Sequence, residues 1–284
     1  MEQVKSVLVT GANGFIGRAT VACLEQAGWR VTRGIRSTEQ SLGGDTISLD
    51  LTKPAAILTL ANEARFDAIV HLGAYVGLSG EAEEEMYVPN VLATGCLAFL
   101  TRQWNAHLIY ASTAIVCGVR TEKIDATSTV APDTAYAHSK WLGEQLIVAS
   151  QCSNCILRIA GVFGADGPTH LGLNRAIDGA MKGTPPTQVG AGGALRNYIY
   201  VKDAAQAIVF ALQCRLEGIH LLAGSEVMPV SQMLQEICKM FLPDQRPVLK
   251  DGQEAMSQVI QPSLDLPTTR KFLEALADIK GPWQ

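Results

Sequence analysis

The sequence lacks the features typical of membrane, secreted and nucleic-acid-binding proteins. No apolar stretch reaches the roughly 20 residues needed to cross a bilayer, and the first residues do not have the basic, apolar and small-residue order of a signal peptide. Lysine and arginine number 23 against 27 aspartate and glutamate, for a net charge of −4. This balance disfavours binding to nucleic acid or to an anionic membrane. We therefore expect a cytoplasmic protein with neither of these partners.

The cysteines indicate neither a disulfide framework nor a metal centre. There are seven of them in 284 residues, whereas disulfide-stapled domains are short and carry cysteines in even number. Cys152 and Cys155 have the spacing of half a zinc site, but no second Cys or His pair lies at ligand spacing. We expect reduced thiols near a strand and no bound metal.

What the chain does have is an apolar content of 48% with 18% charged residues, enough for a substantial core. Short apolar runs alternate with helical patterns, which predicts an α/β fold with a doubly wound parallel sheet covered on both faces. The predicted strands are 6–9, 30–35, 46–49, 68–72, 107–110 and 155–159. The predicted helices between them are 16–27, 54–64, 81–102 and 136–150.

The sequence changes in character after Gly164. A loop at 165–168 is followed by a predicted helix at 174–182, a glycine-rich turn at 190–193 and an alternating strand at 196–201. Asp203 is expected to cap a helix at 204–213, and Ser231 a helix at 232–241, with a last helix at 268–278. We predict a nucleotide-binding domain over 1–165, rejoined by about 198–222, and a smaller, interleaved C-terminal substrate lobe over 166–284.

A glycine-rich turn follows the first predicted strand directly. Gly11, Gly14 and Gly17 are spaced three apart and lead into a helical pattern. The first allows a tight turn, the second lets the backbone approach a ligand, and the third lets helix and strand pack closely. Free N–H groups at the start of that helix would face a pyrophosphate. The turn predicts a dinucleotide site, although a glycine turn that binds nothing is an alternative.

A tyrosine and a lysine four residues apart form the second motif. On a helix, Tyr136 and Lys140 lie on one face. An ammonium and the positive nicotinamide nearby would lower the pKa of the phenol from its usual value of about 10 and make it a usable acid and base. By itself this spacing is also typical of an amphipathic helix with an exposed lysine.

The residues after the fifth predicted strand supply a third motif, Ala111-Ser112-Thr113-Ala114-Ile115-Val116-Cys117-Gly118. It is similar to Ser-Ser/Thr-x-x-Val-Tyr-Gly. Together the three motifs resemble the extended short-chain dehydrogenases/reductases, the NAD(P)-dependent epimerase/dehydratases, which have a Rossmann fold. The resemblance implies that Thr113 is the catalytic hydroxyl beside Tyr136 and Lys140, with Ser112 as helper. Cys117 replaces the family's tyrosine.

The same resemblance extends from residue 6 to about 215 and implies further cofactor contacts. Segments 157–164 and 196–203 are similar to the family's L-R-x-x-x-V-Y-G and R-D-F-I-H-V-x-D. Lys140 would also reach the ribose hydroxyls of the cofactor. The residues implied to bind it are Gly11, Asn13, Gly14, Phe15, Ile16, Gly17, Asp50, Leu51, Leu72, Gly73, Ala74, Asn90, Tyr136 and Lys140.

The end of the second predicted strand favours NADP over NAD. NAD-preferring members carry an acidic residue there for the ribose diol, and Ile35 occupies that position. Arg36, with Arg33 and Ser37 as candidates beside it, would instead pair with a 2′-phosphate. Solvated loop arginines are the alternative, and NAD stays possible.

The resemblance indicates a substrate less clearly. Arg196 and Asn174 match residues that bind the nucleotide in nucleotide-sugar members, although Arg196 could instead form a salt bridge between the lobes, and a late Arg-x-Gly-Asp segment is not recognisable in 251–269. We expect an NAD(P)-dependent oxidoreductase or epimerase that transfers hydride at a hydroxyl or keto carbon of a sugar, with a nucleotide sugar as the first candidate. The alternatives are a reductase or dehydrogenase of a non-nucleotide carbonyl or sugar acid, and a non-catalytic NADP sensor. The resemblance also implies a homodimer.

Overall fold

The computed structural model describes residues 5–36, 44–77 and 83–281. The chain divides into two compact units that interleave along the sequence. The first comprises residues up to 119, then 129–158 and 205–220, and the second comprises 120–128, 159–204 and 221 onward. The first unit therefore ends near 158 rather than 165, and the segment 120–128 belongs to the second unit. Within the described ranges, no helix is long and apolar enough to cross a membrane.

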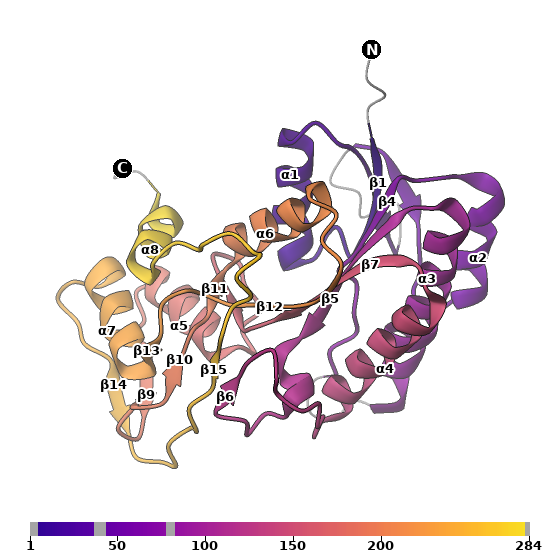
Figure 1. Ribbon diagram of the computed structural model, residues 1–284. Coiled ribbons are helices and arrows are strands. Elements are labelled where there is room, and N and C mark those ends of the chain that lie inside the picture. Colours follow the sequence, from indigo (N-terminus) through magenta and orange to yellow (C-terminus); the bar gives the residue numbers. More distant parts are fainter. Residues whose placement is uncertain (1–4, 37–43, 78–82, 282–284) are drawn as a thin grey trace. The chain divides into compact units, whose positions relative to one another are not determined.

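A seven-stranded Rossmann-type parallel sheet forms the centre of the first unit (Figure 1). Its strands lie in the order β12-β7-β5-β4-β1-β2-β3, and β1 at its centre pairs in parallel with β2 and β4. The strands are β1 Ser6–Thr10, β2 Arg30–Ile35, β3 Thr46–Ser48, β4 Ala68–His71, β5 His107–Thr113, β7 Ser153–Ile159 and β12 Gly218–Leu222. Because β1, β4 and β5 are apolar and almost wholly buried, the sheet needs cover on both faces.

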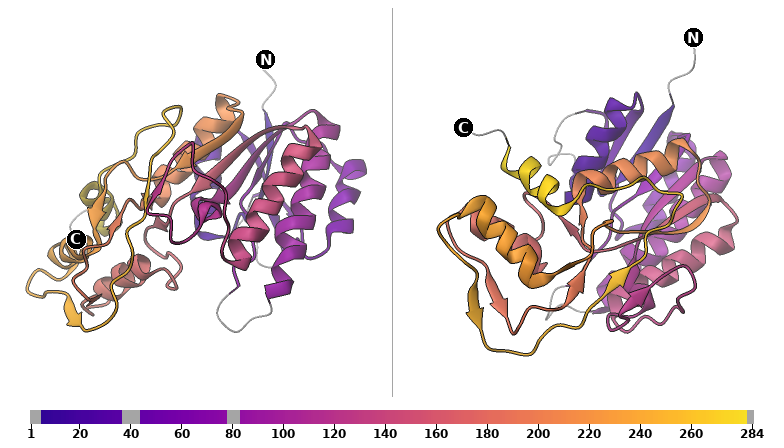
Figure 2. Two further views of the ribbon diagram at one scale, coloured as in Figure 1. Left: turned by 60° about the horizontal axis from the view of Figure 1, so that its bottom comes forward. Right: turned by 60° about the vertical axis from the view of Figure 1, so that its left-hand side comes forward.

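Helices supply that cover. On one face lie α2 Pro54–Glu63, α3 Ala93–Trp104 and α4 Ala135–Ser150, with α3 packed between the other two (Figures 1 and 2). On the other lie α1 Phe15–Gln26 and α6 Val201–Gln213 (Figure 1). Between the sheet and α2–α4 is a closed apolar core that includes Leu8, Ile57, Ile69, Leu97, Leu108 and Ile147.

One predicted helix is not continuous. The pattern at 81–102 becomes a 3-10 turn at Glu83–Met86, a π turn at Val88–Leu92, and only then α3, while residues 81 and 82 lie outside the described ranges. Pro89 supplies the physical reason, because it has no N–H to donate and disturbs the regular hydrogen-bond ladder. The predicted helices 16–27, 54–64 and 136–150 begin and end within one residue of α1, α2 and α4.

The second unit is built from short elements. Its helices are α5 Gly172–Met181, α7 Val230–Phe241 and α8 Phe272–Lys280, and α6 begins in it. Two-stranded pairs join them: β8 Val162–Phe163 with β11 Ile199–Tyr200, β9 Thr187–Val189 with β14 Val248–Lys250, β10 Leu195–Arg196 with β13 Met228–Pro229, and β6 Lys123–Ile124 with β15 Val259–Ile260.

The strand expected at 196–201 was therefore wrong as a single element. Asn197 interrupts it, because its buried side chain donates to the carbonyls of Gly224 and Ile260 and accepts from the Ile260 N–H. The strand on each side of Asn197 pairs with a different partner, β10 with β13 and β11 with β8.

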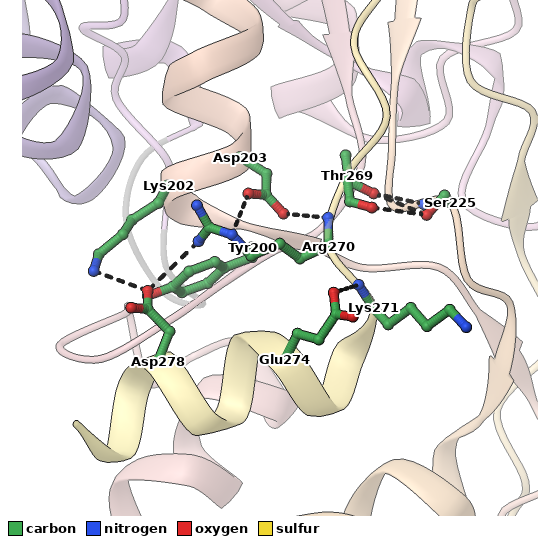
Figure 3. Close-up of polar contacts among 9 residues, drawn as sticks. All are labelled: Tyr200, Lys202, Asp203, Ser225, Thr269, Arg270, Lys271, Glu274 and Asp278. Carbon is green, nitrogen blue, oxygen red and sulfur yellow. Dashed lines mark hydrogen bonds and ion pairs between the residues drawn. The ribbon is translucent and has the colours of Figure 1, made fainter. Parts of the chain in front are cut away.

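Both helix caps expected in this unit were also wrong. The helix α6 starts at Val201, so Asp203 lies in its first turn and accepts instead from the Arg270 N–H at 2.8 Å (Figure 3). The helix α7 starts at Val230, one residue before Ser231.

Asp278 joins the last helix to the start of α6. From α8 it accepts a hydrogen bond from Tyr200 at 2.7 Å and forms an ion pair with Lys202 at 2.8 Å (Figure 3).

Candidate active site

The glycine turn lies between β1 and α1, as its spacing predicted. Gly11 has φ +67°, and a Cβ atom there would come within 2.6 Å of the Gly73 nitrogen. A Cβ at Gly17 would overlap the Gly11 carbonyl oxygen. Two of the three glycines are thus required by close backbone packing. Gly14 precedes the first residue of α1, so the free N–H groups of that helix start at the turn.

A cavity of about 260 Å³ opens beside this turn, at the carboxyl ends of β1, β2, β3 and β4. In doubly wound sheets this edge is where ligands bind. Of the residues predicted to bind a dinucleotide, those that line it are Gly11, Asn13, Gly14, Arg36, Asp50, Leu51, Gly73 and Ala74. Ile35, which the sequence places where NAD-preferring members carry an acidic residue, also lines it. The sequence analysis did not single out the remaining lining residues, which are Ala12, Gly34, Leu49, Thr52, Tyr75 and Pro89. The one sequence signal that could have indicated them as lining residues is their position beside a strand end, the glycine turn or the π turn.

Other predicted cofactor residues are not part of the cavity wall. Those that do not line it are Phe15, Ile16, Gly17, Leu72, Asn90, Tyr136 and Lys140. Asn90 is 1% exposed; it accepts from the Tyr75 N–H at 2.7 Å and donates to the Tyr75 carbonyl and to Ser139. Asn90 thereby holds Tyr75 in the cavity wall. Ser37 lies outside the described residues.

The two arginines near the end of β2 point to different places. Arg36 is exposed and lines the cavity. Arg33 instead pairs with Glu25 on α1, with 2.6 Å between its Nη2 and the carboxylate, and is not part of the cavity wall. The positive charge of Arg36 also helps lower the pKa of Asp50, although the hydrogen bond from Thr52 is the larger cause. Among the described residues that line the cavity, Arg36 is the only one with a positive charge.

Tyr136 and Lys140 lie on α4, one turn apart. The helix is capped by Thr134, whose hydroxyl accepts from the Ala137 N–H at 3.2 Å. Burial raises the pKa of Tyr136 to about 12 and lowers that of Lys140 to about 7, with Glu144 partly opposing the second effect. The expected lowering of the tyrosine pKa by the lysine is therefore absent in the protein alone, because desolvation dominates both groups.

The two hydroxyls at the end of β5 have different surroundings. Ser112 is 4% exposed and donates to Glu144. The same carboxylate accepts a bidentate pair of hydrogen bonds from Arg158, at 3.1 Å from Nε and 2.7 Å from Nη2. Thr113 is half-buried, and its side chain makes no hydrogen bond with any described residue. Of the two, Thr113 has the hydroxyl that is available to a ligand.

The predicted substrate residues lie in the second unit. Asn174 is 1% exposed; it accepts from the Gly164 N–H at 3.2 Å and donates to the Val162 carbonyl at 3.1 Å. Its amide thus shapes the loop after β8, and a direct contact with a nucleotide would require these bonds to be replaced. Arg196 is half-buried and donates through Nη1 to the backbone carbonyls of Leu195 and Met256.

A doubly wound sheet, a glycine turn at its switch of strand order and a Tyr-x-x-x-Lys helix define a nicotinamide-dependent enzyme of the extended short-chain dehydrogenase/reductase type. Residues 7–223 match the model of the NAD dependent epimerase/dehydratase family, and the chain belongs to that family.

Curated relatives within it catalyse different reactions. A GDP-6-deoxy-D-talose 4-dehydrogenase of Aggregatibacter actinomycetemcomitans is 24% identical over 247 residues, which are 83% of this chain and 80% of that protein. A UDP-N-acetyl-alpha-D-glucosaminuronate decarboxylase of Bacillus cytotoxicus is 27% identical over 78% of this chain and 75% of its own.

Solved structures share the fold over nearly the whole chain. The UDP-N-acetylglucosamine 4-epimerase of Bacillus cereus superposes with a TM-score of 0.83 at 24% identity, covering 97% of this chain and 98% of that one. The enzyme WbmH of Bordetella bronchiseptica, solved with NAD+, gives a TM-score of 0.82 at 19% identity and covers 96% of each chain. At these identities the likeness concerns the fold.

Proposed function

We propose that this protein is an NADP(H)-dependent oxidoreductase or epimerase that acts on a hydroxyl or keto carbon of a nucleotide sugar. The observation that carries the proposal is the joint presence of the glycine-turn cavity, the free hydroxyl of Thr113 and the Tyr136–Lys140 pair in one unit. Relatives that act on UDP- and GDP-sugars support the substrate class.

The residues of this chain fit a dinucleotide in the cavity, since the glycines of the turn leave no side chain at Gly11 and Gly14 in its wall and the free N–H groups at the start of α1 begin there. Bound there, the nicotinamide supplies or accepts hydride. Tyr136 moves the proton of the sugar hydroxyl, and the Thr113 hydroxyl orients the same oxygen. Lys140 donates to the ribose, and the positive charge of an oxidised nicotinamide beside the phenol would favour its deprotonated form. Ser112, held by Glu144, fixes the end of β5.

The Tyr136→Phe variant tests the proton-transfer role. Removing the phenol oxygen while keeping the ring should reduce hydride transfer by about 100-fold or more, the usual contribution of a positioned acid or base. Binding of NADPH, followed by its fluorescence, should change little. Unchanged turnover in this variant would overturn the assignment of Tyr136.

The substrate class is tested by calorimetry with UDP, GDP and dTDP, and by NADP reduction with the matching sugars. We expect one nucleotide to bind, with Asn174 or Arg196 variants weakening it. If no nucleotide binds while free sugar acids or simple ketones are turned over, the enzyme is instead a reductase of a non-nucleotide carbonyl. The absence of a recognisable late arginine motif in 251–269 is the observation that favours this second candidate.

The preference for NADP rests on Arg36. Two residues of the cavity wall support it: Ile35, at the end of β2, has no carboxylate to bind a ribose diol, and Arg36 beside it carries a guanidinium that would pair with a 2′-phosphate. The Arg36→Ala variant should bind NADPH about 10-fold or more weakly while its affinity for NADH is unchanged. Arg33→Ala is the matched control, because Arg33 is paired with Glu25. Tighter binding of NADH than of NADPH by the unaltered protein would contradict the preference.

We also propose a homodimer formed through α3 and α4. Leu92 and Phe99, seven residues apart on the same side of the helical segment, are 53% and 55% exposed, and Leu146 on the adjacent helix is 38% exposed. Apolar side chains gathered on neighbouring helices favour burial against a second copy.

A further inference from the structure

The side chain of Lys140 is almost wholly buried on α4. The residue is 1% exposed, and its Nζ makes no hydrogen bond or ion pair with any described residue. What it does contact is an aromatic ring: Nζ lies 4.1 Å from the centroid of Tyr110 on β5. A cation over the face of an aromatic ring is attracted by the ring's quadrupole, most strongly where water is excluded.

The packing of α4 is fitted to that ring. Tyr110 is fully buried, and its hydroxyl lies 3.4 Å from the Lys140 carbonyl oxygen. Gly143, three residues after Lys140, faces the same ring; a Cβ atom there would come within 2.5 Å of the Tyr110 hydroxyl oxygen. The helix can therefore approach Tyr110 closely only because position 143 has no side chain.

A second ring beside Tyr110 is held uncharged. His71 lies 5.4 Å from Tyr110 between ring centroids. The Thr94 hydroxyl donates to the Asn90 carbonyl, so it must accept from the Nε2–H of His71 at 2.9 Å. Nδ1 is then bare and accepts from Thr10 at 2.6 Å. Burial, with a smaller effect of the Lys140 charge, lowers the pKa of His71 well below its usual value, so no second cation competes for the ring.

We propose that Tyr110 is a positioning residue for Lys140: its ring holds the ammonium at the place where the cofactor ribose arrives. This inference rests on the proposed role of Lys140 in cofactor binding. The charged or titratable groups that face the ammonium are His71 on β4, Tyr110 on β5, and Tyr136 and Glu144 on α4. Glu144 also attracts the ammonium, since its charge partly offsets the lowering of the Lys140 pKa by burial, but its carboxylate is bonded to Arg158 on β7, and the Tyr110 ring is the group that Nζ contacts directly.

A double-mutant cycle on NADPH affinity tests the proposal. The variants are Tyr110→Phe, which keeps the ring, Tyr110→Leu, which removes it, Lys140→Met, and the pair Tyr110→Leu/Lys140→Met. If the ring acts through the ammonium, Tyr110→Leu should weaken NADPH binding about 3- to 30-fold, the range of a desolvated cation–π contact. The same change should have almost no effect when Lys140 is already methionine. Tyr110→Phe should retain most of the affinity.

Three results would overturn the proposal. These are equal losses from Tyr110→Leu in both backgrounds, an equal loss in the phenylalanine and leucine variants, or an undiminished affinity in Lys140→Met. Circular dichroism and urea unfolding establish that each variant is folded. If Tyr110→Leu does not fold, the less disruptive Tyr110→Met takes its place in the cycle. Because the readout is NADPH binding, a failure of every nucleotide sugar as substrate would overturn the proposed function and leave this test intact.

Discussion

At the scale of single residues, burial decides the chemistry of the site before any ligand binds. Lys140 and Arg158 are both largely buried cations, but Arg158 meets the carboxylate of Glu144 at 2.7 Å, whereas Lys140 meets a neutral ring. Pairing keeps the pKa of Arg158 above its ordinary value, and desolvation lowers that of Lys140 to about 7. A buried ammonium that lacks a hydrogen-bond acceptor is costly in free energy. A ligand that supplies acceptor oxygens would relieve that cost.

The Lys140→Met variant should be more stable than the unaltered protein at pH 6, and this gain should shrink toward pH 10. The pKa of Lys140 is about 7 when folded and 10.5 when unfolded. Between these values only the unfolded chain holds the proton, so the stability of the unaltered protein rises with pH. Below pH 7 the folded and the unfolded chain both hold the proton of Lys140, so the unaltered protein bears the full free-energy cost of burying that charge.

Urea unfolding of the cofactor-free protein at pH 6, 8 and 10 measures this gain. Lys182→Met is the control, since its side chain is 70% exposed, and it should show no such trend. A stability difference for Lys140→Met that does not vary with pH would contradict the buried, unpaired ammonium.

At the scale of secondary-structure elements, the glycine turn is shaped by the close approach of the α1 backbone to the turn that precedes it. Helix α1 lies directly on the turn because Gly17 has no Cβ. The break before α3 has a similarly local cause in Pro89. The α4 helix shows the opposite relation, since Gly143 is needed for a contact with a strand more than thirty residues away in sequence.

Gly17→Ala should destabilise the protein by about 1–3 kcal/mol, the usual cost of overpacking, and weaken NADPH binding, because the added methyl overlaps the Gly11 carbonyl oxygen. Gly172→Ala, at the first residue of α5, meets nothing within 4 Å and should be neutral or slightly stabilising. Chemical unfolding of both variants provides the comparison. Equal stability of the two would show that α1 can move away from the turn at no cost.

At the scale of the whole molecule, the chain passes between its two units more than once, so neither is a continuous segment. The short strand pairs and helices of the second unit are fixed by side-chain contacts. Asn197 bonds to the Gly224 carbonyl, Asp203 on α6 accepts from the Arg270 N–H, and Asp278 on α8 contacts Lys202 (Figure 3). The first unit presents the exposed apolar residues of α3 and α4 on which we base the proposed homodimer.

The double variant Phe99→Glu/Leu146→Glu should convert that homodimer to a monomer in size-exclusion chromatography with light scattering, because charges at the centre of an apolar interface are strongly unfavourable. Leu264→Glu is the control. That side chain is 97% exposed in the second unit, and its replacement should leave the oligomeric state unaltered. A protein that is monomeric before any substitution would remove the dimer proposal.

The sequence by itself determined the parallel sheet with its helices, the glycine turn and the helical pairing of Tyr136 with Lys140. Each of these depends on periodicity or on spacing within a few residues, which local backbone preferences fix. Only the tertiary structure decided that Ser112 is bound to Glu144, that Arg33 pairs with Glu25, that Asn197 divides a strand and that Lys140 rests on Tyr110. These features depend on contacts between segments far apart in the chain, and on the desolvation that packing imposes, neither of which a local pattern encodes.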